Sequence, residues 1–201
     1  MLDFADVTAH GPGMTDYLYG LSGPSLLCVD DWTDYALIDS GDGRKLERFG
    51  RYKFIRPEPQ AMWAPRLDST VWAADGTFVA SQGRGEDDED SGGWSLSPSL
   101  PEQWEVGYDG LRFIARPTPF RHLGFFPEQA PHWRWCADLI DRFLATHKRP
   151  PRILNLFAYS GVASTHAARA GAEVTHVDAS RKAIAQAFEN RDTADLQDAP
   201  I

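Results

Sequence analysis

The sequence predicts a β-rich, mainly antiparallel N-terminal region followed by an α/β region whose parallel sheet is incomplete. Residues 34–120 contain short runs of aromatic and β-branched residues separated by Asp-Gly pairs, and Asp-Gly favours tight hairpin turns. Over residues 121–201, helical and strand-like patterns alternate, as is typical of α/β domains. A chain of 201 residues has room for one or two hydrophobic cores.

The N-terminal half is expected to hold three turns and at least two hairpins. Residues 1–33 show little periodicity and many turn residues, so we expect a loosely ordered segment. The clearest hairpins pair residues 70–73 with 77–80 and residues 104–108 with 111–115, around Asp-Gly turns. The acidic run 86–90 is expected to be a solvated loop between two strands, because its like charges repel.

The second half begins with an amphipathic helix. In residues 131–147 apolar side chains, including Cys136, recur at helical spacing. Pro150 and Pro151 follow, and proline cannot continue a helix. The apolar run 153–157 then predicts a buried parallel strand.

Two further helices and one strand complete the expected order. Residues 162–170 predict a helix that ends before Gly171, and residues 173–177 predict a second strand. Ser180 is a good N-cap for a third helix through about Asn190. The inner face of that helix is expected to carry Ile184, Ala187 and Phe188.

Composition excludes several classes of function. The net charge of −9 gives no support to non-specific nucleic-acid binding, which needs cations against phosphates. No apolar run approaches the ~20 residues of a membrane span, and the N-terminus does not resemble a secretion signal. We therefore expect a cytoplasmic protein without a membrane partner. No metal site is expected, because His122, His166 and His176 lack cysteine or acidic partners at ligand spacing.

Two loops that follow the predicted strands contain the candidate ligand-binding residues. The turn Ala158-Tyr159-Ser160-Gly161 precedes a helix N-terminus, where free N–H groups favour an anion. Asp178 follows the next strand, 17 residues past Gly161, close to the offset at which a carboxylate binds ribose hydroxyls. The turn has one glycine, whereas a dinucleotide pyrophosphate needs about three. A plain turn with a surface aspartate remains an alternative at this point.

Longer segments resemble a known family. Residues 155–164 (NLFAYSGVAS) and 175–180 (THVDAS) resemble the cofactor loops of class I S-adenosylmethionine-dependent methyltransferases, whose domain is Rossmann-like. More narrowly, they are similar to the bacterial group related to 23S rRNA cytosine-C5 methyltransferases. Residues 35–50, 56–60 and 122–129 are also similar to that group.

The resemblance implies S-adenosyl-L-methionine as cofactor and RNA as a candidate substrate and partner. It places Asp178 on the ribose and the 158–161 turn near the methionine end of the cofactor. Phe126 and Gln129 would flank the pocket, and the matching loops add Asn155 and Ala179 to the binding set. Residues 34–120 would then form the β-rich N-terminal domain, and residues 121–201 the first part of the cofactor domain.

The sequence departs from the family pattern in two respects. It has no counterpart of the Asp-Pro-Pro-Lys stretch that lines the acceptor pocket in the family, and no recognisable N-terminal RNA-binding module. No catalytic residue can be nominated, because neither Cys28 nor Cys136 has a pocket context in the sequence. We therefore expect a fragment that is inactive alone and binds the cofactor weakly or not at all.

Two other interpretations stay open. One is an NAD-dependent oxidoreductase, which the missing glycines disfavour. The other is a non-enzymatic interaction module, in which the incomplete sheet is completed by another chain or by self-association.

Overall fold

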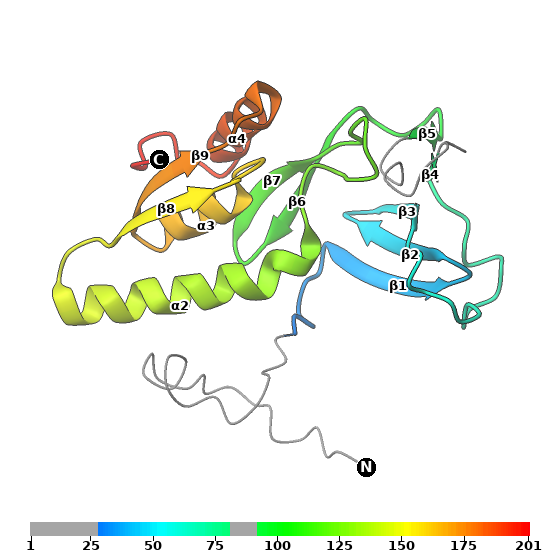
Figure 1. Cartoon of the computed structure of the whole chain (residues 1–201), viewed down its shortest axis with the longest axis horizontal. Helices are drawn as coiled ribbons and strands as arrows, with labels where there is room; N and C mark the ends of the chain where they lie inside the picture. The colour runs from blue at the N-terminus through cyan, green and yellow to red at the C-terminus, as the bar shows by residue number, and fades with distance from the viewer. Residues whose placement is uncertain (1–27, 81–91) are drawn as a thin grey trace, which may run out of the picture.

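The computed structural model describes residues 28–80 and 92–201. Its strands form three sheets: a five-stranded sheet, a two-stranded hairpin and a two-stranded parallel pair (Figure 1). The expectations for most of the N-terminal segment and for the acidic run 86–90 lie outside the described residues.

The five-stranded sheet is mixed rather than purely antiparallel. Its order follows the chain, and its strands are β1 (Tyr35–Gly41), β2 (Arg44–Phe49), β3 (Tyr52–Pro57), β4 (Gly76–Ala80) and β5 (Gly92–Leu96). Neighbours pair antiparallel except β3 and β4, which are parallel. The Asp42-Gly43 turn between β1 and β2 has φ of 50° and 73°, as a tight hairpin turn requires.

The second predicted hairpin is confirmed. Strands β6 (Trp104–Tyr108) and β7 (Leu111–Ala115) pair antiparallel, with Tyr108 opposite Leu111. Asp109 and Gly110 connect them with φ of 48° and 73°. In Figure 1 this hairpin lies between the five-stranded sheet and the α/β half.

The predicted hairpin of residues 70–73 with 77–80 is wrong. Residues 70–73 are not a strand, and β4 pairs with β3 and β5 instead. Local hydrogen bonds occupy this segment, because Asp68 accepts from the backbone and hydroxyl of Thr70. Trp72 is also held by a residue that is distant in the sequence, since its indole N–H donates to the carboxylate of Asp39 at 3.0 Å. Tertiary contacts thus override the β propensity of this run.

The α/β half follows the predicted order. A 3-10 turn, η3 (Pro127–Gln129), leads into α2 (Ala130–His147), and then come β8 (Arg152–Leu156), α3 (Val162–Arg169), β9 (Glu173–Val177) and α4 (Arg181–Thr193). β8 and β9 are parallel. The hydroxyl of Ser180 accepts from the N–H of Ala183 at 3.3 Å and caps α4. Gly171 ends the α3 region with φ of 99°, which favours glycine.

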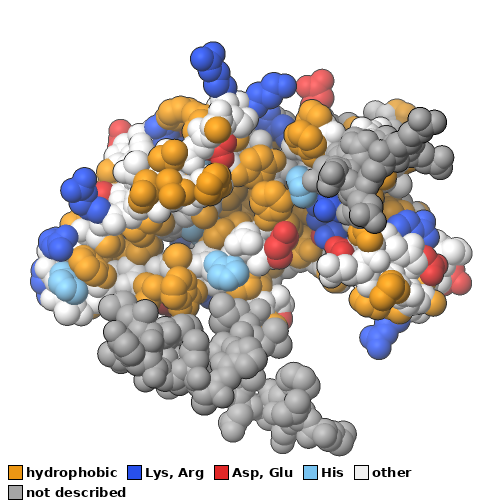
Figure 2. Space-filling model, in the orientation of Figure 1, with side chains coloured by type: hydrophobic (Ala, Val, Ile, Leu, Met, Phe, Trp, Pro, Cys, Tyr) orange, Lys and Arg blue, Asp and Glu red, His pale blue; other side chains and the backbone are white. Residues whose placement is uncertain are grey.

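One face of the β8–β9 pair is exposed to solvent, so the prediction of a buried strand at residues 153–157 is wrong. Side chains alternate across a strand, and Leu154, Leu156 and Val177 share the exposed face. Phe157, just past β8, is 92% exposed. Figure 2 shows apolar side chains gathered over this half of the molecule. Ile153 and Val174 occupy the other face and pack in a core with residues of α2 and α3.

The inner face of α4 differs in part from the prediction. Phe188 is 53% exposed, with the guanidinium of Arg191 over its ring. The buried positions are Ala183, Gln186 and Asn190. Two of these are polar, and Asn190 is buried because its amide bonds to backbone groups of β7 and of the 158–161 turn.

The larger hydrophobic core joins the two halves. It contains side chains of the five-stranded sheet, of the β6–β7 hairpin and of α2 and α3, among them Phe49, Phe54, Val106, Phe113, Phe125, Trp133 and Val162. Trp94 and Trp104 pack against this core. The domain boundary near residue 120 stays a prediction.

Among residues 28–80 and 92–201, no helix is both long and apolar enough to cross a membrane.

Candidate functional site

The 158–161 turn is held in an unusual backbone conformation at the end of β8. Phe157, Tyr159 and Gly161 have φ of 54°, 50° and 77°, and positive φ is uncommon for residues other than glycine. The N–H of Ala158 donates to the carbonyl of Val177 at 3.1 Å, which extends the parallel pairing by one bond. The turn is therefore fixed to the end of β9.

Asp178 closes this turn from the opposite strand. One carboxylate oxygen accepts from the N–H of Tyr159 at 2.8 Å, and the other from the N–H of Ser180 at 2.8 Å. The Ser180 N–H contributes most to lowering the pKa of Asp178, and Tyr159 and His176 add to it. The carboxylate is therefore ionised at neutral pH, and each oxygen keeps one lone pair for a further donor.

Gly161 permits a close approach between the turn and α4. A Cβ at this position would lie 2.8 Å from Cβ of Ala187 and 3.2 Å from its Cα. Real Cβ atoms do not approach other carbons so closely. Glycine is thus required here for packing as well as for its positive φ.

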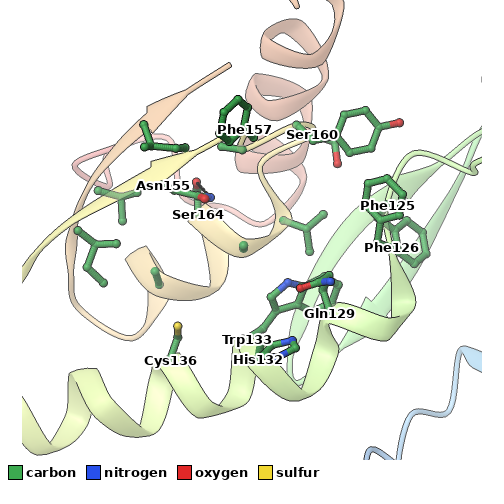
Figure 3. Close-up of a pocket in the computed structure, with 18 of the residues that line it drawn as sticks. Phe125, Phe126, Gln129, His132, Trp133, Cys136, Asn155, Phe157, Ser160 and Ser164 are labelled. Atoms are coloured by element: carbon green, nitrogen blue, oxygen red, sulfur yellow. Dashed lines mark hydrogen bonds between the residues drawn. The ribbon is translucent and has the colours of Figure 1, made fainter. Parts of the chain in front are cut away.

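A cavity of about 500 Å³ lies beside the turn, between β8, α3 and the start of α2. Cavities of this size suit small-molecule ligands. Most of the predicted residues line it, namely Phe126, Gln129, Asn155, Ala158, Tyr159 and Ser160. Figure 3 shows Gln129 on the α2 side and Asn155 on the β8 side of the cavity.

The other predicted residues lie around the turn rather than in that cavity. Gly161 lines a second cavity of about 290 Å³ beneath α4. Asp178 and Ala179 line neither of these two cavities. The Asp178 carboxylate is nevertheless next to the first cavity, because it accepts a hydrogen bond from the backbone of Tyr159, which lines that cavity.

The cavity residues on α2, namely His132, Trp133 and Cys136, were not among the predicted site residues. The prediction that Cys136 lies outside any pocket is therefore wrong. The helical periodicity marked this face as apolar, but it could not show that the face lines a cavity. Burial raises the pKa of the Cys136 thiol, which disfavours the nucleophilic thiolate.

A buried polar chain crosses the wall between the two cavities. The amide of Asn155 donates to the hydroxyl of Ser164 at 3.0 Å, and this hydroxyl lies 3.0 Å from Nδ1 of His176. Asn155 and His176 stand opposite each other in the β8–β9 register. These bonds fix the orientation of Asn155 at the cavity wall.

Aromatic side chains form the far rim of the cavity. The rings of Phe126 and Tyr159 have centroids 5.3 Å apart, and His122 packs on Phe126 at 4.6 Å. Burial, followed by the nearby Asp178, raises the pKa of Tyr159, so its hydroxyl stays protonated. The rim can contact an apolar or aromatic group of a ligand.

Within the described part of the chain, no three histidine, cysteine or acidic side chains gather closely enough to hold a metal ion.

Comparisons with known proteins point to methyltransferases. No family model and no curated protein sequence matches the chain. The solved S-adenosylmethionine-dependent methyltransferase from Agrobacterium tumefaciens is 46% identical, over 89% of this chain and 54% of that chain, with a TM-score of 0.79. A candidate S-adenosylmethionine-dependent methyltransferase from Streptococcus mutans is 15% identical, over 84% and 44%, with a TM-score of 0.58.

A further candidate methyltransferase, complexed with S-adenosylhomocysteine, is 16% identical over 84% of this chain and 44% of that chain, with a TM-score of 0.60. At such identity the likeness shows the fold alone. The chain spans about half the length of these solved structures. The likeness to these solved structures shows that the chain has a methyltransferase-like α/β fold with a strand-rich N-terminal region.

Proposed function

We propose that the chain binds S-adenosylmethionine at the carboxyl ends of β8 and β9, as the donor-binding part of a class I methyltransferase. The supporting observation is the closed turn, in which Asp178 holds the N–H of Tyr159 and keeps acceptor capacity for a ligand. Ligands of open α/β sheets bind beyond these strand ends. The 46% identity to a solved S-adenosylmethionine-dependent methyltransferase supports this choice of ligand.

Each residue of the set has a proposed role. Asp178 accepts hydrogen bonds from the ribose hydroxyls, with Ala179 beside it. The 158–161 turn lies near the methionine end of the donor, where the free N–H groups at the start of α3 favour its carboxylate. Phe126 and Gln129 flank the cavity, and Asn155 contributes its wall.

When bound, the donor supplies an electrophilic methyl group on its sulfonium. The chain's own residues bind and orient it, and rate would come mainly from positioning. Methyl transfer also needs an acceptor site. Cys136 lines the cavity, but the raised pKa of its thiol disfavours it as a nucleophile. Transfer is therefore proposed for the complete enzyme, with this part holding the donor.

The turn favours this donor over a dinucleotide. A pyrophosphate needs close access to the backbone, which is usually provided by three glycines. Here Tyr159 and Ser160 occupy the turn, and Ser160 is only 2% exposed. S-adenosylmethionine has no phosphate and does not require that access.

The test is a titration of the chain with S-adenosylhomocysteine and, separately, with NADH, followed by amide NMR shifts. We expect S-adenosylhomocysteine to shift residues 158–161 and 178–180 with weak, sub-millimolar to millimolar affinity. NADH should leave them unchanged. Equal shifts with NADH, or shifts confined to other regions, would overturn the proposal. Micromolar affinity would contradict the narrower prediction of weak binding.

RNA as the acceptor and a cytoplasmic location remain predictions. The net charge of −9 offers RNA no general electrostatic attraction. A complete enzyme that transfers labelled methyl to protein or small molecules but not to ribosomal or transfer RNA would contradict the RNA prediction.

A second candidate function, self-association through the β8–β9 sheet, is favoured by one observation. Leu154, Leu156, Phe157 and Val177 are 44–92% exposed on or beside one sheet face. Parallel sheets normally have both faces covered. Sedimentation at increasing concentration should then show dimers that Leu156→Lys abolishes. A monomer at all concentrations would exclude this candidate.

A further inference from the structure

Asn190 on α4 is the most deeply buried polar side chain near the turn, with no exposed surface. Its amide nitrogen donates to the carbonyl of Ser160 at 2.7 Å, and its amide oxygen accepts from the N–H of Ile114 on β7 at 2.8 Å. Both bonds are fully buried. One side chain thus joins three separate segments of the chain.

The two partners require an amide side chain. The Ser160 carbonyl needs a donor, and the Ile114 N–H needs an acceptor. Asparagine offers both on one short, rigid group, whereas a carboxylate offers only acceptors and an apolar residue offers neither. A buried backbone group left without a partner is costly, so the side-chain identity matters at this position.

Two ion pairs also link the ends of α4 and β7. Glu189 forms an ion pair with Arg116, and Asp195 forms one with Arg112 at 3.3 Å. These pairs lie on both sides of the bond between Asn190 and Ile114. They are partly exposed and contribute little individually, and neither contacts the turn.

We propose that Asn190 is the positioning residue of the 158–161 turn and ties its geometry to the N-terminal β region. The inference extends the proposed function, since that turn is the proposed donor site. Asn190 holds the Ser160 carbonyl against α4, and Asp178 holds the Tyr159 N–H, which lies two peptide units earlier in the same turn. A shift of β7 would therefore reach the donor site through this side chain.

The test compares Asn190→Asp with a matched control, Gln186→Leu. The first substitution keeps the acceptor for Ile114 but places an acceptor against the Ser160 carbonyl. Gln186 lies one turn earlier on the same buried side of α4, beside Gly124. Its Nε2 is buried without a hydrogen-bond partner, so Gln186→Leu changes a buried amide of α4 without removing a bond to the turn.

Two readouts separate this inference from the proposed function. In the free chain, hydrogen exchange of the Tyr159 amide should accelerate about tenfold or more in Asn190→Asp, as expected for loss of one buried bond, and less than about twofold in Gln186→Leu. The affinity for S-adenosylhomocysteine should fall by a similar factor in Asn190→Asp alone. Equal exchange in both variants would overturn the positioning role. If the unsubstituted chain does not bind S-adenosylhomocysteine, only the proposed function is overturned.

A measurement on the unsubstituted, ligand-free protein covers the case in which Asn190→Asp does not fold. Native-state exchange in rising denaturant should show the Tyr159 and Ile114 amides opening together, with one free energy and one denaturant dependence. Opening of Tyr159 while Ile114 stays protected would overturn the inference.

Discussion

Gly161→Ala should destabilise the protein by two separable effects. The position has φ of +77°, and the left-handed region costs a residue with a Cβ about 1–2 kcal/mol. The new Cβ would also lie 3.2 Å from Cα of Ala187. That atom belongs to the α4 backbone and cannot rotate away, so the helix must shift. Overpacking of this kind costs about 1–3 kcal/mol, which brings the total to about 2–5 kcal/mol.

Gly43→Ala is a matched control for the backbone effect. Gly43 has φ of +73°, and a Cβ there would meet nothing within 4 Å. We expect urea unfolding to give a loss of about 1–2 kcal/mol for Gly43→Ala and a larger loss for Gly161→Ala. The difference, about 1–3 kcal/mol, measures the close approach of α4. Equal losses in the two variants would refute the argument that Gly161 is needed for packing.

Two further predictions concern buried charge. Arg56→Met removes the buried partner of the Glu47 carboxylate at 2.7 Å and leaves it only the weaker pair with Lys45 at 3.9 Å, so it should cost about 3–5 kcal/mol. Arg112→Met, at exposed ion pairs with Glu105 and Asp195, should cost less than about 1 kcal/mol, and similar losses in urea unfolding would contradict this. Burial lowers the pKa of His166 to about 3, so the unfolded chain takes up the proton first. Stability should be complete above pH ~6.5 and fall towards pH 3, by at most about 1.4 kcal/mol per pH unit. His166→Phe keeps a ring against Trp133 and should weaken this dependence; unchanged slopes would argue against it.

Local patterns predicted the α/β half well because its residues obey local rules. Gly171 and Ser180 mark helix ends by backbone conformation and side-chain capping, and both effects act within a few residues. The Asp109-Gly110 turn fixed the β6–β7 hairpin for the same reason. Such features do not depend on distant parts of the chain.

The errors arise where distant contacts decide. The pattern of residues 70–73 predicts a strand, but the indole of Trp72 bonds to Asp39, 33 residues earlier. Phe188 was placed inward, but the polar Asn190 takes the buried position because β7 and the turn present backbone groups there. Neither outcome can be read from the periodicity of the segment itself.

The candidate site shows the same division. The turn and Asp178 were recognisable because they follow successive strands of one sheet. The cavity residues on α2 itself, among them Cys136, were not recognisable, because their position depends on how this helix packs against the rest of the α/β half. Asn190 carried no motif at all, and a buried amide can be assigned a role only when both of its partners are known.

Asp178 is proposed to bind the ribose of S-adenosylmethionine. The most direct test is a double-mutant cycle with S-adenosylhomocysteine and its 2′,3′-dideoxy analogue, measured by ligand NMR on the unsubstituted chain and on Asp178→Asn. If the carboxylate binds the hydroxyls, their removal should weaken binding to the unsubstituted chain about tenfold or more and should have little effect on the variant. Equal losses in both proteins would contradict the claim.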